Sequence, residues 1–321
     1  MVAGTPVLSF EAAEKRYRRS GREVVALDGL TFEVAGPGVH GLVGPNGSGK
    51  TTAMRALVGH VRLTSGSASL FGTRDDAPPL HESLRRTGAL LEAPRFYGRH
   101  SARTALDLHR RLCATPPVRV EEVLEVVGLA ARADDRIRTY SSGMKQRLGI
   151  GVALLSDPDL LVVDEPSNGL DPSGMRRLRT VLRELGDRGR TVLVSSHLLA
   201  DLQLICDSVT VVAAGRCLFN GPVSALPVAD RVVVGVEGRP DLAAAVLRAH
   251  FATGVGVEQR DDQLVVTGLR TTETAVISRV LAANGVHLTS LVPQPGRLED
   301  AFEEMVAATL GPDVDSEWGA S

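Results

Sequence analysis

The chain has 321 residues, enough for two domains that each bury a hydrophobic core. Its net charge of −2 and aromatic content of 3% argue against a nucleic-acid-binding surface, which needs a basic face and stacking rings. The three cysteines, Cys113, Cys206 and Cys217, have the spacing of neither a metal site nor a disulfide framework, and free thiols suit a reducing cytosol.

No apolar run approaches the ~20 residues that a membrane-spanning helix requires. The longest, residues 148–155, has eight residues. The N-terminal basic cluster follows the apolar stretch, the reverse of a secretory signal. We therefore expect any membrane-spanning part to belong to another polypeptide.

Residues 7–43 are predicted to form antiparallel strands that lead to a phosphate-binding loop. The loop matches G-x-x-x-x-G-K-[ST] without a mismatch, and residues 52–58 should form the helix whose N-terminus faces the phosphates. Glycine lets backbone N–H groups curl around an anion, the lysine reaches the outer phosphates, and the threonine offers its hydroxyl to Mg²⁺. The loop residues, with the next threonine, are Gly44, Pro45, Asn46, Gly47, Ser48, Gly49, Lys50, Thr51 and Thr52.

The loop lysine is notable because lysine occurs at only two other positions, Lys15 and Lys145, in a chain with 36 Lys plus Arg. A phosphate loop has room for a compact point charge and not for a planar guanidinium. A chance match on a glycine-rich turn is the alternative when the motif is taken alone.

Residues 80–156 are predicted to be mostly helical. Ser101 has the position of an N-cap for a helix over 102–114, Pro116 and Pro117 break it, and Gly128 ends the next helix. Glu92 follows a strand-like stretch, residues 87–91, and is a surface loop residue when taken alone.

Two apolar strands, residues 159–163 and 191–196, belong to a predicted parallel sheet covered on both faces. Asp164 and Glu165 follow the first strand, at the edge where such sheets bind ligands. Asp164 is expected to hold Mg²⁺ through water, and Glu165 to deprotonate the attacking water. His197 follows the second strand. Taken in isolation, Asp164 and Glu165 could be a solvated pair before a turn, and His197 could have a purely structural role.

Residues 140–147, Tyr-Ser-Ser-Gly-Met-Lys-Gln-Arg, lie between these motifs and could form a second anion site at a helix N-terminus. With this segment the chain resembles the nucleotide-binding subunits of ABC transporters, whose signature is Leu-Ser-Gly-Gly-Gln. Ser141 and Gly143 match that signature, whereas Tyr140, Ser142 and Met144 depart from it. The resemblance implies that the signature of one subunit closes over ATP held by another, although Ser141 alone could be an ordinary helix cap.

The resemblance covers residues 7–222 and implies further roles. Tyr17 would stack on adenine, Asp171 would couple the two sites, and His197 would contact the γ-phosphate. Glu92 stands where the family usually has a Mg²⁺-contacting glutamine at the hinge to the membrane partner. With the Ser-x-Gly-Met-Lys-Gln-Arg signature, this variant resembles antibiotic-resistance and bacteriocin-immunity exporters of the bacitracin type. Packing for Tyr17 and a β-turn at Asp171 are the structural alternatives.

Residues 225–310 read as β-α-β-β-α-β followed by a helix, which predicts a small ferredoxin-like α+β domain. This domain resembles the C-terminal extensions of drug-export ABC subunits, which implies a role in dimerisation or regulation, and a purely structural appendage is the alternative. Residues 311–321 are predicted to be a disordered tail. The expected fold is thus an α/β P-loop NTPase of ABC type over residues 1–224, with a mixed sheet core, an antiparallel β subdomain and a helical subdomain over 80–156.

The function that follows is an ATP- and Mg²⁺-dependent ATPase subunit of a bacterial exporter. It would form a homodimer with two ATP molecules at the cytoplasmic face of a separate permease, without binding nucleic acid. An ABC ATPase acting on the ribosome or DNA is the alternative, but one phosphate loop and no heptad run disfavour it. A nucleotide sensor without turnover is disfavoured by Glu165 and His197.

Overall fold

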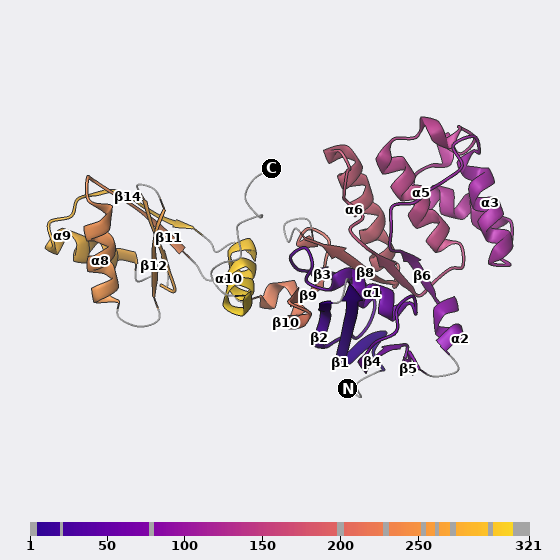
Figure 1. Ribbon diagram of the computed structural model, residues 1–321. Coiled ribbons are helices and arrows are strands. Elements are labelled where there is room, and N and C mark those ends of the chain that lie inside the picture. Colours follow the sequence, from indigo (N-terminus) through magenta and orange to yellow (C-terminus); the bar gives the residue numbers. More distant parts are fainter. Residues whose placement is uncertain are drawn as a thin grey trace. The chain divides into compact units, whose positions relative to one another are not determined.

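The chain folds into two compact units, shown as a computed structural model in Figure 1. The first comprises residues up to Ala225, and the second comprises residues 226–305. The end of the last helix, from Val306, groups with the first unit, whereas the sequence had assigned the whole helix to the second domain. The predicted tail, residues 311–321, lies outside the described residues, which are 5–19, 22–76, 80–197, 202–226, 231–251, 255–260, 263–269, 274–294 and 298–310.

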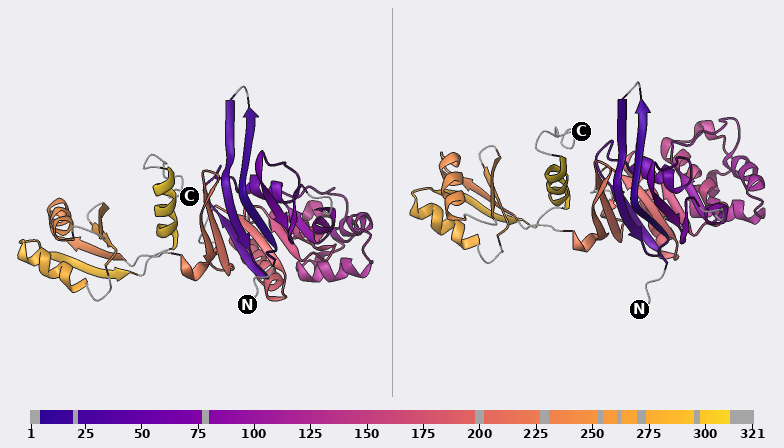
Figure 2. Two further views of the ribbon diagram at one scale, coloured as in Figure 1. Left: turned by 90° about the horizontal axis from the view of Figure 1, so that it is seen from below. Right: turned by 60° about the horizontal axis from the view of Figure 1, so that its bottom comes forward.

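The first unit begins with a four-stranded antiparallel sheet in the order β2-β1-β4-β5. Strands β1 (Leu8–Arg19) and β2 (Arg22–Val34) form a long pair, which extends beyond the remaining strands in Figure 2. The shorter strands β4 (Ser65–Leu70) and β5 (Thr73–Arg74) complete the sheet. The predicted antiparallel pairing of the N-terminal region is therefore present for β1 and β2.

A six-stranded mixed sheet forms the centre of the unit, in the order β10-β9-β3-β8-β7-β6. Its parallel strands are β3 (Gly38–Val43), β6 (Thr87–Leu90), β7 (Leu160–Val163), β8 (Thr191–Ser196) and β9 (Ser208–Ala213). Edge strand β10 (Arg216–Pro222) runs antiparallel to β9. The prediction that residues 7–43 are all antiparallel strands was wrong for β3, whose buried residues pair with β8 and β9 instead.

The helices of the first unit confirm that residues 80–156 are mostly helical. Ser101 caps α3 by accepting a hydrogen bond from the Thr104 N–H, and Gly128 follows α4 with φ +61°. The helices are α1 (Lys50–Leu57), α2 (Leu80–Arg85), α3 (Ala102–Leu112), α4 (Val118–Val126), α5 (Ser142–Leu154) and α6 (Pro172–Asp187). Short 3₁₀ turns lie at Ala130–Arg132, Ile137–Thr139 and Val223–Ala225.

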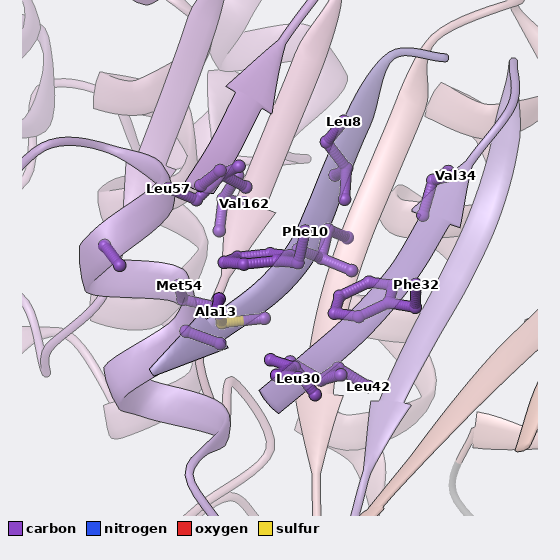
Figure 3. Close-up of a cluster of buried hydrophobic side chains, with 14 of the residues drawn as sticks. Leu8, Phe10, Ala13, Leu30, Phe32, Val34, Leu42, Met54, Leu57 and Val162 are labelled. Atoms are coloured by element: carbon purple, nitrogen blue, oxygen red, sulfur yellow. The ribbon is translucent and has the colours of Figure 1, made fainter. Parts of the chain in front are cut away.

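A continuous hydrophobic core joins the two sheets across helix α1 (Figure 3). The rings of Phe10 on β1 and Phe32 on β2 stack with centroids 5.0 Å apart. Met54 and Leu57 of α1 are buried in the same cluster, together with Val162 of β7. Because each such side chain contributes about 1.5–3 kcal/mol when fully buried, this core fixes α1, and with it the phosphate loop, against the sheet.

The second unit has the predicted β-α-β-β-α-β order and an antiparallel sheet in the order β12-β13-β11-β14. Val234 and Leu264 of the sheet are fully buried, as are Leu247, Ile277 and Leu281 of the two helices packed on it. Its elements are β11 (Arg231–Val236), α8 (Pro240–His250), β12 (Gly256–Arg260), β13 (Gln263–Thr267), α9 (Thr274–Ala283) and β14 (Leu288–Gln294), followed by α10 (Leu298–Leu310).

Candidate active site

The loop between β3 and α1 has the backbone geometry that its glycines allow. Gly49 adopts φ +108°, a conformation that residues with a side chain rarely reach. A Cβ atom on Gly44 would lie 2.1 Å from the Val212 carbonyl oxygen, so only glycine fits between the loop and β9. The loop thus passes close to the sheet and turns directly into α1, whose free N–H groups favour an anion.

Lys50 is buried within this loop, with 5% of its side chain exposed. Its Nζ donates hydrogen bonds to the carbonyl oxygens of Gly44 at 2.7 Å and Pro45 at 3.1 Å. It also lies 3.6 Å from Oε1 of Glu165. Burial lowers the pKa of the Lys50 ammonium, while the charges of Glu165 and Asp164 act in the opposite direction.

Asp164 follows β7 and accepts hydrogen bonds on both carboxylate oxygens. Its Oδ2 accepts from the Thr51 hydroxyl at 2.7 Å, and its Oδ1 accepts from the Ser195 hydroxyl. The parallel pairing of β7 with β8 brings Asp164 and Ser195 together. Val163 lies opposite Val194, and Asp164 and Ser195 are the residues that follow them. The motif after β7 is therefore joined to the phosphate loop and to β8.

Glu165 is held through both its backbone and its carboxylate. It adopts φ +44°, unusual for a residue with a side chain, and its backbone N–H donates to the Ser195 hydroxyl at 2.7 Å. Oε2 accepts a hydrogen bond from Nδ1 of His197 at 2.9 Å. The carboxylate thus lies between His197 and Lys50, with 18% of its side chain exposed.

Lys50, Glu165 and His197 line one pocket of about 390 Å³, whereas Asp164, Gly44 and Pro45 are not part of its lining. Strand β2 supplies its apolar wall, the phosphate loop supplies its floor, and the segments after β7 and β8 supply its polar groups. The lining residues are Val24, Val25, Ala26, Asn46, Gly47, Ser48, Gly49, Lys50, Thr51, Thr52, Glu165, Asn168 and His197. The residues expected from the phosphate loop and the two strand ends therefore converge, and the arrangement can bind a phosphate chain beside a carboxylate base.

Other predicted site residues lie outside this pocket lining. Ser141 caps α5 by accepting from the Met144 N–H at 3.2 Å, and Asp171 caps α6 by accepting from the Gly174 N–H at 3.1 Å. Gly143 lies in the first turn of α5. Tyr17 pairs in register with Val24, a residue of the pocket wall, and Lys15 lies over its ring.

Glu92, at the position of the family's Mg²⁺-contacting glutamine, is also not part of the pocket lining. Its side chain is 79% exposed, and it forms an ion pair with Arg55 of α1 at 3.1 Å. Within the described residues, no three His, Cys, Asp or Glu side chains form a group that could hold a metal by themselves.

Sequence reasoning missed several residues of the site. Ser195 forms hydrogen bonds with Asp164 and Glu165. The sequence feature that could have indicated this is the polar pair Ser195–Ser196, which interrupts an apolar strand just before His197. Val24 and Val25 line the pocket although nearly half of each is exposed. Asn168, three residues before Asp171, lines the pocket as well.

A larger cavity, of about 660 Å³, lies among α4, the end of α5 and the end of α6. Most of its charged side chains pair with one another: Arg119 with Glu122 and Asp157, Arg190 with Asp157, and Arg188 with Glu184. Only the pairs made by Asp157 join separate elements, and the cavity lacks the phosphate loop and the carboxylates after β7, so we place the candidate active site at the smaller pocket.

Comparison with known proteins agrees with this geometry. Residues 27–168 match the family model described as ABC transporter. The uncharacterized ABC transporter ATP-binding protein YhcH of Bacillus subtilis is 34% identical over 312 residues, which cover 94% of this chain and 97% of the relative. The bacitracin transport ATP-binding protein BcrA of Bacillus licheniformis is 31% identical, over 89% of this chain and 94% of the relative.

A solved ATP-binding subunit of an ABC transporter has a similar fold. It is 27% identical with a TM-score of 0.59, over 68% of this chain and 91% of that structure. No helix within the described ranges is both long and apolar enough to span a membrane.

Proposed function

Because the chain belongs to the ABC transporter ATP-binding proteins, we propose that it energises a separate membrane permease in a bacterial exporter of antibiotics or peptides. As a member of this family the chain is an ATPase with a P-loop NTPase fold. The exporter assignment is supported by the relative named for bacitracin transport, which matches almost the whole chain.

The observation that carries the proposal is the convergence of Lys50, Glu165 and His197 on one pocket. The Lys50 ammonium would bind the outer phosphates, together with backbone N–H groups of the loop. Its two present acceptors are backbone carbonyls of the same loop, so the ammonium can move to a phosphate by a small change in its side chain.

Hydrolysis would proceed by proton removal from a water beside Glu165. The Glu165 carboxylate accepts the proton while the water oxygen bonds to the γ-phosphorus, and the bond to the ADP oxygen breaks, giving ADP and phosphate. His197 donates to Glu165 at 2.9 Å and would orient this carboxylate before also contacting the γ-phosphate.

The Thr51 hydroxyl and the Asp164 carboxylate fit Mg²⁺, because they are hard oxygen groups 2.7 Å apart. One carboxylate is enough where substrate phosphates complete the ligand set. Mg²⁺ bound there would offset the charge of the phosphates. Glu92 would contact Mg²⁺ at the hinge to the permease, at the position where the family usually has glutamine.

The remaining predicted residues would act between two copies of the chain. Ser141 and Gly143 lie at the N-terminus of α5 and outside the pocket lining, which suits the closing of a signature over ATP bound to another copy. Asp171 would couple the two sites, and Tyr17 would stack on adenine beside Val24. The dimer would sit at the cytoplasmic face of the membrane through its permease.

A reconstitution experiment tests this proposal. The purified chain should release phosphate from Mg-ATP, and its co-expression with the cognate permease should raise the bacitracin concentration that a sensitive strain tolerates. Glu165→Gln should abolish both effects. Absence of phosphate release would contradict the enzymatic assignment, whereas release without any association with a permease would contradict the exporter assignment.

A further inference from the structure

We propose that Ser195 is a positioning residue that sets the geometry of both carboxylates in the ATPase site. This inference rests on the proposed function, because it assigns the metal and base roles to Asp164 and Glu165. Ser195 lies on β8, two residues before His197, and is 0% exposed. Its hydroxyl forms hydrogen bonds with both of these residues.

The Ser195 hydroxyl donates one of these hydrogen bonds and accepts the other. The hydroxyl proton goes to Oδ1 of Asp164, and a lone pair of the same oxygen accepts the N–H of Glu165 at 2.7 Å. A hydroxyl has one proton to donate, so the Asp164 bond fixes its direction. Ser195 therefore links the side chain of one residue to the backbone of the next.

The bond to Glu165 supports an unusual backbone conformation. Glu165 has φ +44°, an unfavourable conformation for a residue with a side chain, which persists only where the surroundings hold it. Pro166 follows and provides no N–H of its own to stabilise the turn. The Ser195 bond holds the Glu165 N–H, and this backbone places the carboxylate between Lys50 and His197.

The hydrogen bond from Ser195 fixes the orientation of the Asp164 carboxylate. With Oδ1 bonded to Ser195, Oδ2 faces the Thr51 hydroxyl of the phosphate loop. Partners that orient a metal-ligating carboxylate in this way tune metal affinity and activity. Removing the Ser195 hydroxyl should therefore affect Mg²⁺ use and proton transfer together, while the phosphate loop and the apolar wall continue to bind nucleotide.

Steady-state kinetics of Ser195→Ala tests the inference. We expect kcat to fall about 10- to 100-fold, with KM for ATP changed less than about threefold, and Mg²⁺ binding to the ADP-bound protein, measured by calorimetry without turnover, to weaken. Ser195→Thr keeps the hydroxyl and should recover most of the lost kcat. The matched control is Thr191→Val, which removes another buried hydroxyl of β8 whose bond goes to the Gly36 carbonyl, away from the carboxylates.

The outcomes separate this inference from the proposed function. A Ser195→Ala variant with kcat and Mg²⁺ binding like the wild type would overturn the positioning role, as would equal losses in Ser195→Ala, Ser195→Thr and Thr191→Val. A wild-type chain without phosphate release would instead overturn the proposed function. Should Ser195→Ala fail to fold, Ser195→Cys provides the test, because its weaker donor should lower kcat in a folded protein.

Discussion

Nδ1 of His197 lies 2.9 Å from one carboxylate oxygen of Glu165, while Nζ of Lys50 lies 3.6 Å from the other. One carboxylate thus contacts both of the side chains expected to bind the γ-phosphate. Binding of a phosphate chain would draw Lys50 and His197 toward it and leave Glu165 free to accept a proton from water.

We expect Glu165→Gln to keep ATP binding and to lose about 10²- to 10⁴-fold in turnover, because the amide cannot act as the general base. ATP should then persist and trap a dimer, detected by size-exclusion chromatography with Mg-ATP. Lys50→Ala should bind ATP weakly and stay monomeric. Glu184→Gln, at an exposed position of α6, is the matched control and should hydrolyse ATP normally. Near-native turnover in Glu165→Gln would remove Glu165 as the base.

The sequence predicted the parts of the site that depend on local patterns. The phosphate loop and the carboxylates after β7 follow from short motifs whose geometry is set within a few residues. By contrast, the order of strands depends on pairings between distant segments. The placement of β3 between β8 and β9, and of Ser195 beside Asp164, follows from that order. The apolar wall at Val24 likewise depends on where the β1–β2 pair lies against the loop.

The signature at Ser141 should act on ATP bound to a second copy. Mixing Lys50→Ala subunits with Ser141→Arg subunits should restore ATPase activity, because some heterodimers then contain one intact composite site. Phosphate release by the mixture is measured against each variant alone, with mixed dimers verified by affinity tags.

Helix capping requires its own control in that experiment. Ser141→Arg also removes the N-cap of α5, which costs about 1 kcal/mol. Ser101→Arg removes the equivalent N-cap of α3 and should leave ATP hydrolysis intact. If verified mixed dimers show no recovery of activity, the composite homodimer is contradicted and a different cassette partner is favoured.

Glu92 should tune coupling to the permease more than ATP affinity. Its exposed ion pair with Arg55 contributes at most about 1 kcal/mol, so Glu92→Gln should unfold at nearly the wild-type temperature. We expect it to alter Mg²⁺ dependence and the stimulation of ATPase activity by the reconstituted permease. Arg55→Gln breaks the same pair and keeps the carboxylate, so it should change neither. Unchanged Mg²⁺ titration and stimulation in Glu92→Gln would identify Glu92 as a surface residue.

His40 should make the stability of the first unit depend on pH. It is buried in β3, between the hydroxyls of Ser208 at 2.6 Å and Thr210 at 2.8 Å, and burial lowers its pKa from 6.5 to about 4. The unfolded chain therefore binds a proton at a higher pH than the folded chain does. The free energy of unfolding should fall as pH decreases from 6.5 to 4, by up to about 3 kcal/mol from this residue, and no further below pH 4.

Urea denaturation at pH 7, 5.5 and 4.5 measures this dependence. His40→Gln cannot be protonated, so the difference in stability between wild type and variant should shrink as pH falls. Thr191→Val provides the control, because it changes no titratable group and its difference in stability from the wild type should stay constant with pH. A constant difference in the free energy of unfolding between wild type and His40→Gln across the three pH values would show that the pKa of His40 is the same in the folded and unfolded states.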